Sequence, residues 1–184
     1  MPATWISVGC GTARDLEYVL GHVKACGTRL WLLDLSVDLL AVAKLRVEKL
    51  GIAEQVTCLV GDVCDASLQG LPPLGTVDVV TCSYCLTMIP PWREALDAMI
   101  RYLRVGGQLG IVDFTCRSDR PPSDWSQRLV RWWFSNDAVY LNGEHTATLK
   151  ARPDLRTIWA HESEKRVVYT PLHATSYIFV GVKV

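Results

Sequence analysis

Glycines and carboxylates follow three short apolar runs near the amino end, where they could form one ligand-binding edge. The Gly9-Cys10-Gly11 motif comes directly after the first run, and glycine allows both a tight turn and a close backbone approach to a ligand. Asp34 follows the second run, and its carboxylate can accept hydrogen bonds from both hydroxyls of a ribose. The Gly61-Asp62 pair follows the third run, where an acid can meet the amino group of an adenine. Together these features predict a site for an adenosine cofactor.

The same glycine loop bears on which adenosine cofactor would bind. The dinucleotide fingerprint has a third glycine after GxGxx, which allows close packing of helix on strand and approach of the pyrophosphate. Arg14 occupies that position here, so a nicotinamide oxidoreductase is disfavoured, although an arginine can also meet a phosphate. A cofactor without a pyrophosphate fits the pattern better. The alternative for Asp34 and Asp62 is purely structural, as helix caps or solvated loop residues.

The elements that must position these residues alternate along the first two-thirds of the chain. Short β-branched runs separated by helical patterns are typical of a parallel sheet, in which ligands bind at the carboxyl ends of the strands. We expect helices over 15–24, 36–50 and 92–103, with Ser36 capping the second helix and Gly51 ending it. The strands are expected at 5–8, 29–33, 56–60, 77–82 and, after a turn at Gly106-Gly107, 108–114.

The pattern changes after Phe114. Pro121-Pro122 breaks the chain, Ser123 is expected to start a helix, and two late strands are expected at 155–161 and 177–182. The sequence therefore predicts an α/β, Rossmann-like fold: a seven-stranded, mostly parallel sheet with a C-terminal antiparallel hairpin strand and helices on both faces. All 184 residues are expected to form a single domain, 1–184, with a helical insertion at about 119–150 between strands five and six.

Composition and charge exclude several other classes of protein. Nineteen basic and nineteen acidic residues give a net charge of zero, which argues against a nucleic-acid partner because phosphate neutralisation needs clustered positive charge. No apolar run reaches the ~18 uncharged residues of a membrane span, and no signal peptide is recognised, so we expect a cytoplasmic protein. The one CxxC, Cys82 to Cys85, lacks the second pair of a zinc site and the helix of a thioredoxin-like unit. We therefore predict neither metal nor redox chemistry.

The constellation resembles the class I S-adenosylmethionine-dependent methyltransferases. The segment 8–13 is similar to their first motif, Asp34 to their second acidic site and Gly61-Asp62 to their adenine site, although the acidic residue common in their first strand is absent. The resemblance implies S-adenosylmethionine as the cofactor, with its methionine portion above the glycine loop, its ribose on Asp34 and its adenine near Asp62. The full set of cofactor residues that it implies is Gly9, Cys10, Gly11, Asp34, Leu35, Asp62, Val63 and Ser83.

Three further stretches narrow the resemblance to the methyltransferase domain of betaine lipid synthases. They are the loop 83–92, the segment 132–141 and the terminal segment 177–181. The resemblance implies that the acceptor is the amino group of diacylglyceryl-homoserine, a lipid amine. It also implies a partner or fused domain, a 3-amino-3-carboxypropyl transferase that makes this lipid. Relatives usually carry helical sequence before the first strand, whereas four residues precede Trp5, so we expect the N-terminal lid helix to be absent.

Methyl transfer from a sulfonium to an amine is an in-line displacement that needs neither an enzymic nucleophile nor a metal. The amine must lose a proton before each attack, so a base or a water path helps. Tyr84, Asp113 and His145 are the candidate catalytic residues. The alternatives are wall packing for Tyr84, loop solvation for Asp113 and a surface position for His145.

A lipid acceptor requires contact with a membrane that the chain does not span. The helix expected around Trp125–Phe134 carries aromatic residues at helical spacing with Arg128 and Arg131 interleaved, which is typical of an interfacial helix on an intracellular membrane. A lid or core helix that packs these aromatics onto the sheet explains the same pattern equally well. Two alternatives for the function stay open: a methyltransferase for a soluble small molecule, and a catalytically incomplete cofactor-binding subunit.

Overall fold

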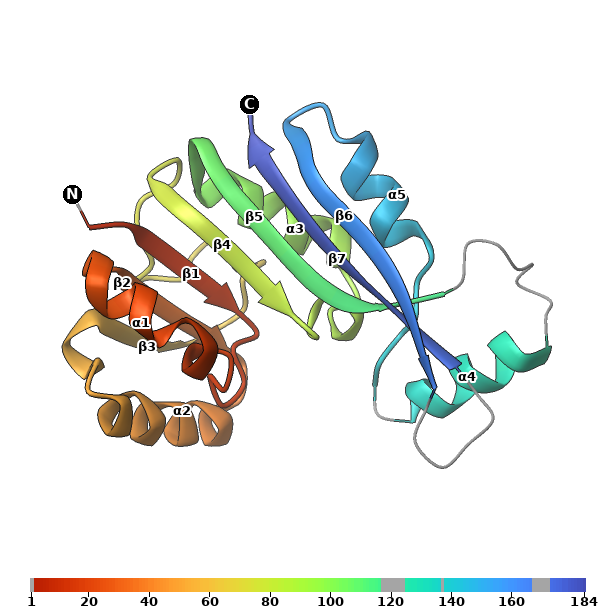
Figure 1. The fold of residues 1–184 in the computed structure, drawn as a ribbon, viewed down its shortest axis with the longest axis horizontal. Helices are drawn as coiled ribbons and strands as arrows, with labels where there is room; N and C mark the ends of the chain where they lie inside the picture. Colours follow the sequence, from red (N-terminus) through yellow and green to blue (C-terminus); the bar gives the residue numbers. More distant parts are fainter. Residues whose placement is uncertain (1, 117–124, 137, 167–172) are drawn as a thin grey trace.

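Seven strands form one sheet in the order β3-β2-β1-β4-β5-β7-β6 (Figure 1). The computed structural model describes residues 2–116, 125–136, 138–166 and 173–184. The strands are β1 (Thr4–Val8), β2 (Arg29–Asp34), β3 (Val56–Val60), β4 (Val77–Ser83), β5 (Leu103–Thr115), β6 (Leu155–Arg166) and β7 (His173–Lys183). Neighbours pair in parallel from β3 to β5, whereas β7 runs antiparallel to both β5 and β6. The predicted seven-stranded sheet with its antiparallel C-terminal strand is confirmed.

Helices lie on both faces of this sheet, as predicted. They are α1 (Leu16–Cys26), α2 (Val37–Leu50), α3 (Trp92–Tyr102), α4 (Trp125–Ser135) and α5 (Glu144–Ala151), with 3₁₀ turns at Ala53–Gln55 and Leu86–Met88. Buried side chains of α1 and α2 pack with Leu30 and Leu32 of β2, whereas those of α3 and α5 belong to the cluster that contains Leu33. Since neighbouring residues of a strand point to opposite faces, β2 contributes to both layers of the core.

Both ends of α2 follow the sequence prediction. Ser36 precedes the helix, and its hydroxyl accepts a hydrogen bond from Leu39 N at 3.2 Å. Gly51 ends the helix with a φ of +68°, a left-handed conformation that glycine adopts at little cost. The first cap also places the end of β2 beside the start of α2, at the edge of the sheet where a cofactor is expected.

The predicted start of β5 is wrong. The strand begins at Leu103, directly after α3, and runs through the glycine pair that was predicted to form a turn. Val77 pairs with Leu103 and Val79 with Gln108, so residues 104–107 form a bulge opposite one residue of β4. Arg104 in this bulge donates from Nε to Asp78 Oδ1 at 2.7 Å. A bulge needs a partner strand to exist, which explains why local sequence suggested a turn instead.

The later strands are also longer than predicted. β6 extends to Arg166, and β7 begins at His173. Between β5 and β6 lie α4 and α5, which together span 125–151, where a helical insertion at about 119–150 was predicted. The predicted break at Pro121-Pro122 and the predicted helix start at Ser123 lie outside the described residues. Within the described ranges, no helix combines the length and the apolar character needed to cross a bilayer.

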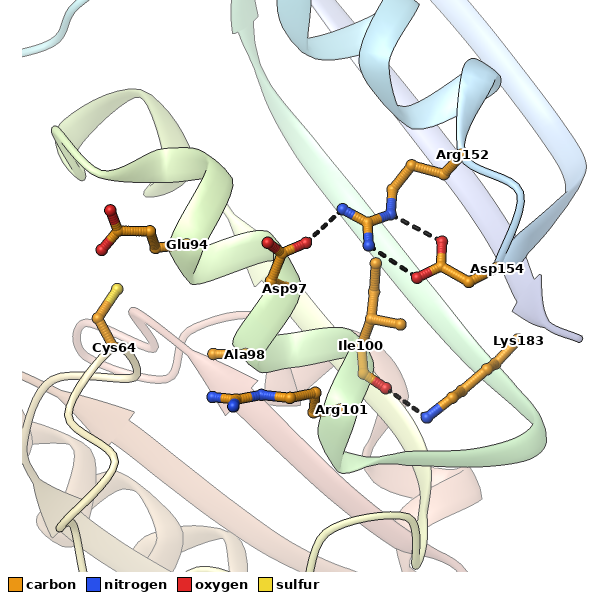
Figure 2. Close-up of a pocket in the computed structure, with 9 residues that line it drawn as sticks. All are labelled: Cys64, Glu94, Asp97, Ala98, Ile100, Arg101, Arg152, Asp154 and Lys183. Atoms are coloured by element: carbon orange, nitrogen blue, oxygen red, sulfur yellow. Dashed lines mark hydrogen bonds and ion pairs between the residues drawn. The ribbon is translucent and has the colours of Figure 1, made fainter.

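Charged side chains attach α3 to the segment between α5 and β6 and to the end of β7 (Figure 2). Arg152 donates two hydrogen bonds to Asp154, from Nε at 2.8 Å and from Nη2 at 2.7 Å, and it also bonds Asp97 of α3. Lys183 Nζ donates to the carbonyl oxygen of Ile100 at 2.9 Å, near the end of the same helix. Together with Cys64 of the turn after β3, these residues line a cavity of about 560 Å³ along α3.

Candidate functional site

The loop between β1 and α1 takes a conformation that its glycines allow. Gly9 has a φ of +62° and Gly11 a φ of +53°, both in the left-handed region. A Cβ added to Gly9 would lie 2.1 Å from Cys85 Sγ, whereas a Cβ added to Gly11 would meet nothing within 4 Å. Only glycine at position 9 therefore lets this loop pack against the segment that follows β4.

Asp34 joins the glycine loop to the end of β2. Its Oδ2 accepts a hydrogen bond from Gly11 N at 2.7 Å, and its Oδ1 accepts one from Ser36 N at 2.9 Å. Cys10 N donates to Leu33 O at 3.1 Å, which holds the same two segments together. A carboxylate oxygen has a second lone pair, so Asp34 can also accept from ribose hydroxyls. The structural role and the ligand role of Asp34 are therefore compatible.

The end of β3 lies next to Asp34. Gly61 N donates to Asp34 O at 3.0 Å, and Asp62 Oδ1 accepts from Cys64 N at 2.8 Å, which holds the turn after the strand. Asp62 is exposed and Val63 is buried beneath it, whereas Leu35 is exposed on the side of β2. The structure thus brings the predicted residues 9–11, 34–35 and 61–63 together along one edge of the sheet.

Ser83 and Cys10 belong to the same region. Both line a cavity of about 320 Å³ between α1 and the sheet. Burial and the neighbouring Asp34 carboxylate raise the pKa of the Cys10 thiol, so Cys10 is a neutral wall residue at pH 7. All seven cysteines are free thiols, and Cys85 packs against Gly9. Within the described residues, no three His, Cys, Asp or Glu side chains gather as ligands for a metal ion.

Asp113 is buried and holds the loop after β4. Its Oδ2 accepts from Thr87 N at 2.9 Å, and its Oδ1 accepts from Thr87 Oγ1 at 2.8 Å and from Phe114 N at 2.7 Å. Burial raises the pKa of the carboxyl, and these hydrogen bonds act in the opposite direction. The alternative of a solvated loop residue is wrong, because Asp113 has no exposed surface. Thr87, which sequence reasoning missed, is its main partner.

Tyr84 lies at the open side of the same loop. Its φ of +52° is unusual for a residue with a side chain, and its N donates to Val112 O at 2.7 Å. The ring is 50% exposed and contacts Phe114, with the two centroids 5.0 Å apart. Phe114 in turn contacts Phe134 of α4, at 4.9 Å between centroids. Neither phenylalanine was predicted as a site residue, although Phe114 directly follows Asp113.

His145 is buried in α5, so the alternative of a surface histidine is wrong. Only 1% of its surface is exposed, and its ring lies 4.5 Å from the ring of Trp92. Its Nδ1 is 3.4 Å from the hydroxyl oxygen of Tyr177. Burial, with the nearby Arg93 charge, lowers the pKa of His145 to about 4, so the ring is neutral at pH 7.

The three predicted catalytic residues therefore occupy different surroundings. Tyr84 and Asp113 flank the loop after β4, next to the cofactor edge. His145 lines a separate cavity of about 490 Å³, which it shares with Thr87 and Tyr140. A link between the two regions is the hydrogen bond from Tyr140 N to Thr87 O at 2.9 Å.

Comparison with known proteins identifies relatives. A family model described as a methyltransferase domain matches residues 6–107, which include the glycine loop, Asp34 and Asp62. The chain is 31% identical to a demethylmenaquinone methyltransferase of Bacillus cytotoxicus over 104 residues, 56% of this chain and 41% of that protein. It is 25% identical to a phosphatidylethanolamine N-methyltransferase of Cereibacter sphaeroides over 139 residues, 73% of this chain and 64% of that protein.

A solved structure shares the whole fold. It is a phosphoethanolamine N-methyltransferase of Haemonchus contortus in complex with phosphomonomethylethanolamine and S-adenosylhomocysteine, with a TM-score of 0.74. The sequence identity is 16%, and the similarity covers 100% of this chain and 49% of that chain. The chain thus spans less than two-thirds of the length of each of these three proteins.

Proposed function

The chain belongs to the methyltransferase domain family, the class I enzymes that use S-adenosylmethionine, and on that premise we propose that it methylates the amino group of a lipid headgroup. The finer form of the proposal is that the acceptor is diacylglyceryl-homoserine. A 3-amino-3-carboxypropyl transferase, as a partner or a fused domain, would then make this acceptor. The N-methyltransferase relatives support an amine acceptor, since both are named for ethanolamine compounds.

The observation that carries the lipid part of the proposal is the position of α4. Phe134 of this helix contacts Phe114, which lies beside the loop after β4. Val130, one helical turn before Phe134, is buried. Trp132 and Trp133 are 61% and 50% exposed. Tryptophans prefer the headgroup region of a bilayer, so these exposed side chains support a contact between α4 and a membrane surface. The side chain of Trp125, predicted to join this contact, lies outside the described residues.

The chemistry needs little beyond orientation. The amine nitrogen attacks the methyl carbon of the sulfonium in line, the new C–N bond forms as the C–S bond breaks, and S-adenosylhomocysteine leaves. Holding the two reactants in this geometry can supply about 7–11 kcal/mol of the barrier. The ammonium proton leaves before each attack, and the hydroxyl of the half-exposed Tyr84 can accept a hydrogen bond from the amine while water takes the proton. Asp113 acts indirectly, because it fixes Thr87 and thereby the loop that carries Tyr84.

A methyltransferase assay with lipid vesicles tests the proposal. We expect formation of S-adenosylhomocysteine with vesicles that contain diacylglyceryl-homoserine, and little with free homoserine. Demethylmenaquinone in the same vesicles is the competing acceptor, because the Bacillus cytotoxicus relative is named for it. Turnover of homoserine alone would favour the soluble-substrate alternative, and turnover of the quinone alone would replace the amine proposal.

Asp34→Ala is the matched loss-of-function variant for this assay. The change removes the acceptor of Gly11 N and Ser36 N as well as the expected ribose contact. We expect the affinity for S-adenosylhomocysteine, measured by calorimetry, to fall at least about 100-fold. Asp38→Ala, at an exposed position in the first turn of α2, serves as the control and should bind normally. Normal binding by Asp34→Ala would contradict the assigned cofactor edge.

A further inference from the structure

Three aromatic rings from separate parts of the chain contact one another in a row beside the cofactor edge, with Phe114 between Tyr84 and Phe134. Tyr84 follows β4, Phe114 lies near the end of β5, and Phe134 lies near the end of α4. The rings of Tyr84 and Phe114 meet at 48°, and those of Phe114 and Phe134 at 57°. Tilted rings at such distances attract one another, so the three elements meet in one continuous aromatic surface.

The backbone of Tyr84 keeps its ring at the open end of this surface. A left-handed conformation is strained for a residue with a side chain, so the surrounding contacts must hold Tyr84 there. One of these contacts is the hydrogen bond from Tyr84 N to Val112 O. The next residue, Cys85, packs against Gly9. The exposed ring is therefore one residue away from the contact with the cofactor loop.

The buried carboxyl group of Asp113 lies one residue before Phe114 in β5. The groups that donate hydrogen bonds to it, on Leu86, Thr87 and Phe114, are all neutral. The attraction for a positively charged ligand therefore comes from the π faces of the three rings.

We propose that Tyr84, Phe114 and Phe134 form a subsite for an organic cation, the methylated ammonium of the acceptor headgroup. The inference rests on the proposed function, because the ammonium is the group that the reaction changes. Each transfer replaces an N–H donor by a methyl group, until a trimethylammonium has no donor left. An aromatic face binds such a cation without hydrogen bonds. The subsite therefore retains partly methylated acceptor for the next transfer.

Two soluble probes of the same shape test this subsite. Choline carries a trimethylammonium group, and 3,3-dimethylbutan-1-ol is its neutral carbon isostere. With S-adenosylhomocysteine bound, we expect the protein to bind choline about tenfold more tightly than the isostere in a saturation-transfer NMR titration. Tyr84→Leu should reduce this preference to about twofold or less, and Tyr84→Phe should keep it.

Matched variants separate the subsite from general damage. Tyr18→Leu, at an exposed position of α1, should keep the full preference for choline. Affinity for S-adenosylhomocysteine reports whether Tyr84→Leu is folded, and Phe134→Leu replaces it if that affinity is lost. Equal binding of the two probes by the wild type, or an unchanged preference in the folded variants, would overturn the inference.

The outcome is distinguishable from that of the vesicle assay. Preferential binding of choline without turnover of any lipid amine would leave the cation subsite standing and remove the proposed acceptor. Turnover of a lipid amine by a protein that binds both probes alike would leave the proposed function standing and remove the subsite.

Discussion

At the scale of single residues, burial decides what the polar side chains of this site can do. Asp113 and His145 are both almost fully buried, and burial opposes the charged form of each. Asp113 uses its lone pairs to hold Thr87, which makes it a positioning residue in our proposal. His145 packs against Trp92 and Tyr177. Tyr84 is the one of the three candidates whose ring is open to an acceptor.

The low pKa of His145 predicts a loss of stability in mild acid. Its pKa is about 4 in the folded protein and about 6.5 when exposed, so the unfolded chain binds this proton first as the pH falls. The contribution of neutral His145 is complete above about pH 6.5 and is lost progressively toward pH 4. From this group alone, we expect the free energy of unfolding to be up to about 2 kcal/mol lower at pH 5 than at pH 7.5.

Urea denaturation of variants at the two pH values measures this effect. His145→Gln should reduce the difference between pH 7.5 and pH 5, whereas His22→Gln, at an exposed position of α1, should not. The wild type alone does not isolate the effect of His145. Because the pKa of Asp113 is raised in the folded protein, protonation of Asp113 increases the free energy of unfolding as the pH falls, which opposes the effect of His145. An identical pH dependence in wild type and His145→Gln would show that His145 is not protected from protons in the folded state.

At the scale of elements, the glycine loop and the segment after β4 depend on each other. Both follow neighbouring parallel strands, since Val8 pairs with Cys82 in the register of β1 and β4. Cys85 Sγ occupies the space that a side chain at Gly9 would need. A substitution in the glycine loop should therefore also disturb the loop after β4, and a substitution in the loop after β4 should also disturb the glycine loop.

Alanine substitutions in this loop should separate backbone strain from crowding. Gly9 and Gly11 both have a positive φ, so each alanine costs about 1 kcal/mol from the backbone alone. Gly9→Ala also meets Cys85, and we expect it to lower the free energy of unfolding by about 1–3 kcal/mol more than Gly11→Ala. Urea denaturation measures both variants.

A double-mutant cycle with Cys85→Gly checks the cause. Removing the Cys85 side chain should restore most of the extra loss in Gly9→Ala, because the side chain that crowds the new methyl group is gone. If the two changes simply add, the contact between the loops is not the reason for the loss.

At the scale of the whole molecule, α4 is the helix through which we propose that the protein contacts a membrane. The net charge is zero, so attraction to a membrane has to come from local features rather than from overall charge. Trp132, Trp133 and Leu129 supply an exposed apolar surface on α4, and Arg128 is exposed beside it. In our proposal this surface places the aromatic rings of the acceptor subsite at the depth of the headgroups.

Loss of the two exposed tryptophans should weaken binding to membranes. We expect the double variant Trp132→Ser/Trp133→Ser to reduce co-sedimentation with anionic lipid vesicles about tenfold or more, because tryptophan side chains account for much of the buried apolar area. Its affinity for S-adenosylhomocysteine should be unchanged. Trp159→Ser, at a similarly exposed position in β6, is the matched control. Equal co-sedimentation of all variants would contradict the contact through α4.

The positions of most helices and strands were predictable because they depend on residues that are close together in the sequence. The caps at Ser36 and Gly51 and the alternation of strands and helices depend on residues close together in the chain. The cofactor edge was predictable for a related reason, since the carboxyl ends of parallel strands meet at one edge whatever the details of packing. The predicted cofactor residues at the ends of β1, β2 and β3 accordingly lie together.

What the sequence by itself determined is therefore the parallel sheet and the edge at which its ligand residues gather. Only the tertiary structure decided the bulge at residues 104–107, the burial of His145 and the use of Asp113 to hold Thr87. The same holds for the contact of Tyr84, Phe114 and Phe134, which come from distant parts of the chain. The alternation of strands and helices is implied by short-range patterns, whereas strand order, pKa, exposure and side-chain contact depend on which distant segments come together.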